Sequence, residues 1–148
     1  MNDNFLRYRH NVALSPRLNE WIIERAAKIK WHPSSDAPSN LEDLKAVADD
    51  IPILDQFNED NIFGDPDVNM MFRAWHDSVH IKHDLPMDLL GETRAAFIQA
   101  AELPSDWWFE RFLLMTEITG QVCYYEVHNN FVNTQRAFTI NVLRTGEI

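Results

Sequence analysis

The chain has 148 residues, of which 45% are hydrophobic and 24% charged, and its formal net charge is −10 at pH 7. These values predict one soluble domain over residues 1–148 and exclude disordered, collagen-like and repeat architectures. The acidity disfavours nonspecific nucleic-acid binding and anionic membrane surfaces, and no stretch approaches the ~18 apolar residues that span a bilayer. The single cysteine, Cys123, excludes an intrachain disulfide framework, so we expect a cytoplasmic protein.

Two helices are predicted in the first fifty residues. Ser15-Pro16 is a typical helix start, and apolar residues recur at helical spacing over residues 18–29. Pro33 ends this helix, because the residue before a proline is pushed out of the α region. Ser39-Asn40-Leu41-Glu42 has the pattern of a capping box and predicts a short helix over residues 39–49. Residues 51–64 are then expected to form a connecting loop.

Three further helices follow, and no strand is predicted. The first begins at Asp65-Pro66-Asp67 and runs to about His83, and the second covers about residues 91–102. Ser105-Asp106 is expected to cap a long final helix that reaches at least Asn133. Residues 137–143 either extend that helix or form a terminal strand, since their apolar residues also alternate. The predicted fold is an all-α, single-domain helical bundle of about five helices with a long C-terminal helix.

Three of the six histidines lie at positions i, i+4 and i+7 of the predicted helix over residues 65–83: His76, His80 and His83. At ~100° per residue this spacing places them on one helix face, about one turn apart. Histidine is the commonest metal ligand, and two imidazoles at i and i+4 can reach one ion. A face exposed to solvent, or a role in helix capping, is the structural alternative.

The predicted C-terminal helix carries a second line of polar residues. Glu110, Glu117, Gln121, His128 and Gln135 fall close to one line along it, with large apolar residues on either side. Since a buried carboxylate requires a partner, this pattern indicates a buried polar or metal-binding strip. The alternative is that the opposite face forms the core and leaves the line solvated.

Together the two faces predict a metal centre between helices, as in carboxylate-bridged metal bundles. The expected ligands are His76, His80, Glu117 and His128, with Glu92 and His83 as further candidates. Imidazole with carboxylate suits iron, manganese or zinc, and does not choose among them. In an enzyme, the ion would activate water or dioxygen for an unknown small-molecule substrate. Glu117 or Glu92 would serve as a ligand or as the proton acceptor, and Tyr124 would be an orienting hydrogen-bond donor.

Three families share parts of this pattern. The architecture and ligand types resemble ferritin-like di-iron proteins, although no Glu-x-x-His pair lies on the candidate line. His76, His80 and His128 resemble the ligand set of the three-histidine DinB-like bundles, with the pair before the single histidine. His76-Asp77 is similar to the dyad of HD-type phosphohydrolases and oxygenases. No family motif is complete here.

A rival hypothesis is a non-enzymatic, acidic helical protein that binds a partner, or a second copy of itself, through an aromatic surface. It rests on the five Trp and nine Phe residues and on the absence of a complete catalytic motif. Burial separates the two hypotheses. If Trp107, Trp108 and Phe112 form one exposed patch while His76 and His80 point into solvent, the interaction protein is favoured.

Overall fold

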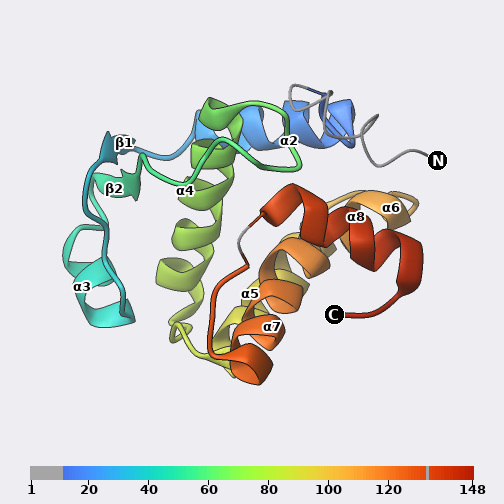
Figure 1. Cartoon of the computed structure of the whole chain (residues 1–148). Coiled ribbons are helices and arrows are strands. Elements are labelled where there is room, and N and C mark those ends of the chain that lie inside the picture. The colour runs from blue at the N-terminus through green and yellow to red at the C-terminus, as the bar shows by residue number, and fades with distance from the viewer. Residues whose placement is uncertain (1–11, 133) are drawn as a thin grey trace.

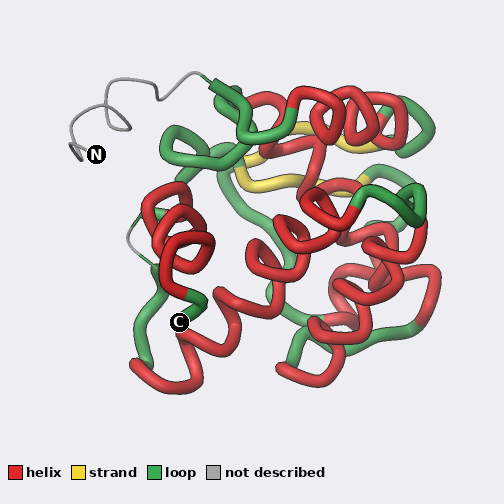
Figure 2. The backbone as a smooth tube through the Cα atoms, turned by 90° about the vertical axis from the view of Figure 1, so that its right-hand side faces the viewer, coloured by secondary structure: helices red, strands yellow, loops and turns green. Residues whose placement is uncertain are grey.

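The computed structural model describes residues 12–132 and 134–148, and this part of the chain is mostly helical (Figures 1 and 2). The mostly helical prediction is therefore confirmed. The elements in chain order are α2 (Pro16–Ala26), β1 (Trp31–Ser34), α3 (Leu41–Ala46), β2 (Ile51–Leu54), α4 (Pro66–His83), α5 (Leu89–Glu102), α6 (Trp108–Met115), the π-helix η1 (Thr116–Gly120), α7 (Gln121–His128) and α8 (Gln135–Thr145). No helix in the described ranges is long and apolar enough to cross a membrane.

The helix starts that proline marks are where the sequence predicts them. Ser15 caps α2 by accepting a hydrogen bond from the backbone N–H of Leu18, and Asp65 caps α4. Two other starts differ. Asn40, not Ser39, caps α3, and α5 begins at Leu89 after the cap residue Asp88, ahead of the predicted residue 91. Local side-chain competition decides such shifts, because several polar residues near each start can accept the same bond.

A small parallel sheet replaces part of the predicted loop. β1 pairs with β2 in the register Trp31 with Ile51 through Ser34 with Leu54 (Figure 2). The prediction that residues 51–64 form only a loop was therefore wrong at its start. Ile51 and Ile53 are buried in a minor core with residues of α3 and α4. Such pairing joins distant segments, and four-residue strands give a weak signal in the sequence.

The predicted long C-terminal helix was wrong in its end point and contains a π-helical turn. The chain there forms α6, η1 and α7, and α7 ends at His128 because Asn129 adopts a left-handed conformation with φ 54°. Asn133 lies outside the described residues. A separate helix, α8, follows, so residues 137–143 are helical and not a strand. No side chain caps α6, in contrast to the role expected of Ser105-Asp106.

The helix α4 is central to the molecule. It packs against α2, α5, α3 and β2, and Figure 1 shows α2 crossing one end of it. The main core lies between α2, α4, α5 and α6 and includes Ile22, Trp75 and Leu113. The histidine-bearing helix is thus fixed on several sides, which holds its side chains in defined positions.

Candidate metal centre

Two histidines of α4 and one glutamate of α5 meet between these helices. Nε2 of His76 and Nε2 of His80 lie 3.0 Å apart. Oε2 of Glu92 lies 2.8 Å from the first nitrogen and 3.3 Å from the second. Within the described part of the chain, this is the group of His, Cys, Asp and Glu side chains placed to hold a metal ion. His80 is completely buried, and the side chains of His76 and Glu92 are 15% and 16% exposed.

The other ring nitrogen of each histidine faces a carbonyl oxygen. Nδ1 of His80 lies 2.8 Å from the backbone oxygen of Leu85, and Nδ1 of His76 lies 2.7 Å from Oε1 of Gln99. A carbonyl oxygen only accepts hydrogen bonds, so both Nδ1 atoms donate. In a neutral imidazole the remaining nitrogen then carries a lone pair. Both Nε2 atoms can therefore accept a hydrogen bond or bind a metal ion. In metal proteins, a ligating histidine commonly donates its other N–H to a carbonyl or carboxylate oxygen in this way.

This arrangement needs a positive charge at its centre. Two nitrogen lone pairs 3.0 Å apart, with a carboxylate beside them, repel one another unless a proton or a metal ion lies between them. Burial lowers the pKa of His76, but the hydrogen bond and charge of Glu92 outweigh it and raise that pKa overall. Burial raises the pKa of Glu92, but hydrogen bonds from the two histidines hold it at about 2. Without metal, the group is an imidazolium–carboxylate pair.

The spacing of the three atoms also suits a metal ion. Donors at right angles, each about 2.1 Å from one ion, are separated by about 3.0 Å. The observed separations of 3.0, 2.8 and 3.3 Å fall around this value. Three such donors on one side of an ion leave its remaining positions for water or substrate. A proton and a metal ion can thus occupy the same place, and they compete for it.

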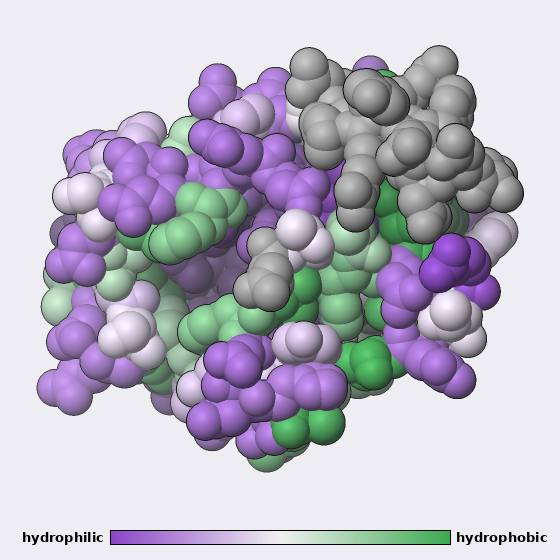
Figure 3. All heavy atoms as spheres, viewed as in Figure 1, coloured by the Kyte–Doolittle hydropathy of each residue, from purple (hydrophilic) through white to green (hydrophobic). Residues whose placement is uncertain are grey.

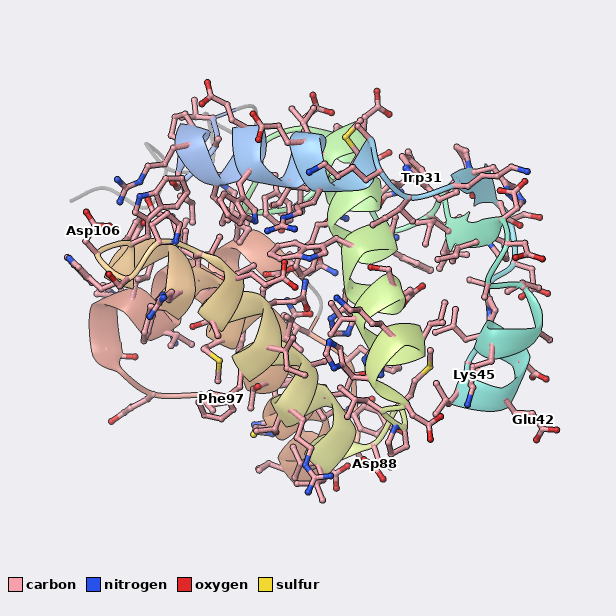
Figure 4. The ribbon with its side chains drawn as sticks, turned by 180° about the vertical axis from the view of Figure 1, so that it is seen from behind. Trp31, Glu42, Lys45, Asp88, Phe97 and Asp106 are labelled. Carbon is pink, nitrogen blue, oxygen red and sulfur yellow. The ribbon has the colours of Figure 1, made fainter. Side chains whose placement is uncertain are left out.

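The α4–α5 connection brings Glu92 to the histidines. Asp84 takes a left-handed conformation at the end of α4, with φ 54°, and reverses the chain. α5 then packs so closely that a Cβ on Gly91 would lie 1.7 Å from the backbone oxygen of Pro86. Figure 4 shows Asp88, the cap of α5, at this turn. The fully buried Ala95 and Ala96 keep the two helices close along the next turn.

An acidic and an aromatic side chain lie around the group. Phe72, one turn before His76, stacks on its ring with centroids 6.1 Å apart. Burial raises the pKa of Asp77 to about 6, although the charges of His76 and His80 oppose this rise. No hydrogen bond joins Asp77 to the three ligands within the described residues. It therefore influences the site through its charge.

Several candidate residues from the sequence lie outside this group. His83 and His128 are exposed, at the ends of α4 and α7. Glu117 is buried against α8, where Thr139 donates a long hydrogen bond of 3.5 Å to it. The ring of Tyr124 packs on His128 and Phe138 instead. The polar line is divided as well, since Glu110 is paired with Arg17 near the start of α2.

Gln99 was not singled out from the sequence, although a signal existed. It follows Glu92 by seven residues, so both project from the same face of α5 toward α4. Helical periodicity alone does not identify which polar residue supports a ligand, because that depends on the facing helix.

Comparisons with known proteins add no functional assignment. No family model matches the chain, and no curated protein or solved structure matches it either. The functional argument therefore rests on the geometry of the site.

Proposed function

We propose that this protein binds one divalent transition-metal ion through His76, His80 and Glu92. The observation that carries the proposal is the convergence of three ligand atoms from two helices in a largely buried place. Both histidines are oriented by carbonyl acceptors so that Nε2 faces the centre. Such orientation of both rings supports a metal site over an incidental ion pair.

Two histidines with one carboxylate form a ligand set used by non-haem iron(II) and by catalytic zinc. Both uses leave positions open for water, dioxygen or substrate. The proposal therefore includes metal-dependent oxidation or hydrolysis of a small molecule, within a small helical bundle formed by α4, α5 and the α6–α7 segment. The partly exposed side chains of His76 and Glu92 are where solvent can reach the group. Figure 3 shows hydrophilic and hydrophobic residues intermixed on one face of the molecule. A cytoplasmic location belongs to the same proposal.

The test is metal titration of the full chain produced without a histidine tag. Zinc binding is measured by calorimetry, and cobalt(II) is used as a spectroscopic probe of the number and type of ligands. Wild-type protein should bind one ion. His76→Ala and Glu92→Gln each remove one ligand and should weaken binding by at least about 100-fold.

His83→Ala is the matched control, because His83 lies on the same helix and is exposed. It should bind zinc as the wild type does. If His76→Ala and Glu92→Gln bind as tightly as the wild type, or if the folded wild-type protein takes up neither zinc nor cobalt, the proposal is wrong. Iron(II) added without oxygen, followed by measurement of oxygen uptake, then separates a redox site from a hydrolytic one.

A second candidate function rests on exposed aromatic residues of α6. Trp108 is 75% exposed and Phe112 is 41% exposed, as the interaction hypothesis expects, but Trp107 is half-buried and packs against the main core. Its other condition is not met, because His80 is fully buried and His76 is mostly buried. We therefore place this function second. Sedimentation of the wild type and of Trp108→Ala tests for a second copy as partner, and an unchanged monomer excludes self-association through this surface.

A further inference from the structure

Glu117 is a buried carboxyl group that the proposed metal site does not use. It lies in the π-helix η1, and its residue is only 7% exposed. Oγ1 of Thr139 on α8 donates a hydrogen bond to it over a long 3.5 Å. Hydrogen bonding with the side chain of Gln121 on α7 also lowers its pKa. Short π-helical segments occur often at functional sites, and a buried carboxylate without a strong partner is costly.

Among the described residues, Glu117 forms no ion pair with a charged side chain. Arg73 of α4 is the charged side chain that acts on it, but this guanidinium already donates to the backbone oxygens of Leu54, Gln56 and Phe57. Other charged residues of the neighbouring helices have partners elsewhere or are exposed: Glu92 of α5 contacts the histidines, Glu110 of α6 pairs with Arg17, and Glu126 and His128 of α7 are exposed. Arg136 of α8 donates through Nη1 to the oxygen of Asn61, while its Nε is buried without a partner among the described residues.

The contact between η1 and α8 is polar and incompletely bonded. α8 packs mainly on η1, with Phe138 over Gly120 and Thr139 beside Glu117. The amide oxygen of Gln135 and Nε of Arg136, both on α8, are buried with no hydrogen-bond partner among the described residues. Unsatisfied polar groups weaken an interface, so local detachment of α8 from η1 costs less free energy than it would with all these hydrogen bonds made.

We infer that α8 is a pH-sensitive flap: it is closed while Glu117 is a neutral acid and opens when this carboxyl group loses its proton to water. A neutral carboxyl group can remain between η1 and α8, whereas a carboxylate needs water that the closed interface excludes. Opening would uncover the apolar face of α8 that includes Phe138 and Val142. This inference does not depend on the metal site.

The pKa of Glu117 in the closed and open states gives the size and sign of the pH dependence of α8 opening. Burial is the main influence and raises its pKa to about 7, while Gln121, Arg73 and Thr139 oppose the rise. With the flap open, the carboxyl group is in water and has its ordinary pKa of 4.5. The closed state therefore binds the proton more tightly, and closing is favoured at low pH. The opening constant should rise roughly 20-fold between pH 5.5 and 7.5.

Native-state hydrogen exchange of the full chain tests the flap. Exchange rates of α8 and α2 amides are corrected for the intrinsic effect of pH and converted to opening constants. In the wild type, α8 should open more readily than α2, and its opening constant should rise with pH as stated. Glu117→Gln keeps the shape of the side chain without its titration, so the rise should disappear in this variant.

Two results would overturn the inference. If α8 and α2 amides exchange with the same opening constant, α8 opens only when the whole domain unfolds. If Glu117→Gln and the wild type show the same pH dependence for α8, another group controls the helix. Zinc binding of Glu117→Gln is measured alongside, because this variant retains all three ligands of the proposed metal site and should bind as the wild type does.

Discussion

Oε1 of Gln99 accepts a hydrogen bond from Nδ1 of His76 over 2.7 Å, although Gln99 is completely buried. The amide nitrogen of the same side chain has no partner among the described residues. A buried amide with an unsatisfied nitrogen destabilises the fold. The favourable contribution of Gln99 therefore comes from the hydrogen bond that its oxygen accepts from His76. That contact fixes which nitrogen of His76 faces Glu92.

Replacing Gln99 by Leu should separate metal binding from folding. The variant removes the acceptor for His76 but also removes the unsatisfied amide nitrogen, so the free energy of unfolding without metal should change by less than about 1 kcal/mol. Zinc affinity should fall about 10- to 100-fold, because the ring is no longer held in one tautomer. Calorimetry and urea unfolding measure the two quantities. If Gln99→Leu and the wild type bind zinc with equal affinity, Gln99 does not orient His76 for metal binding.

Gly91→Ala should disturb the approach of α5 to α4. The added Cβ would lie 1.7 Å from the oxygen of Pro86, so the turn must move. We expect a loss of about 1–3 kcal/mol in unfolding free energy, together with weaker zinc binding, since Glu92 is the next residue. Arg94→Ala, an exposed change on the same helix, is the control and should stay within about 0.5 kcal/mol. A stable Gly91→Ala protein with normal zinc affinity would show that the turn adjusts freely.

Glu92 should control the stability of the metal-free protein in acid. Its pKa in the folded protein is about 2, below the ordinary 4.5, so the stabilisation is present above pH 4.5 and is lost as pH falls toward 2. The shift corresponds to about 3 kcal/mol at most. Urea unfolding of Glu92→Gln should show lower stability near pH 5 and a flatter decline in acid. Glu20→Gln, an exposed change, should follow the wild-type curve. If the stability of Glu92→Gln falls in acid as steeply as that of the wild type, groups other than Glu92 cause the acid sensitivity of the fold.

His76 should make metal stabilisation depend on pH near neutrality. Glu92 raises the pKa of His76, so in the metal-free protein the protonated pair is stable below pH 6.5 and is lost as pH rises through that raised pKa. Zinc must displace this proton, and its binding should therefore weaken as pH falls. Melting temperatures with zinc and with chelator should differ clearly at pH 7.5 and much less at pH 5.5. A difference that does not shrink in acid would place the bound zinc away from the histidines.

The sequence by itself determined the histidine helix. Asp65-Pro66 fixes where α4 begins, and four-residue spacing places His76 and His80 on one face whatever surrounds them. It also determined the start of α2 at Ser15-Pro16, because capping and proline geometry act within one turn. These features depend on contacts between near neighbours in the chain, and periodicity reveals them.

Only the tertiary structure decided which acid joins the histidines. Glu117 and Glu92 were both candidates. The tight turn between α4 and α5, where Gly91 lies against Pro86, brings Glu92 to the histidines, while Glu117 lies against α8. The left-handed turn at Asn129 and the π-helix η1 divide the predicted long helix, so its polar line does not form one strip. These outcomes depend on which distant segments pack together. The free energy of that packing cannot be read from the spacing of residues along one helix.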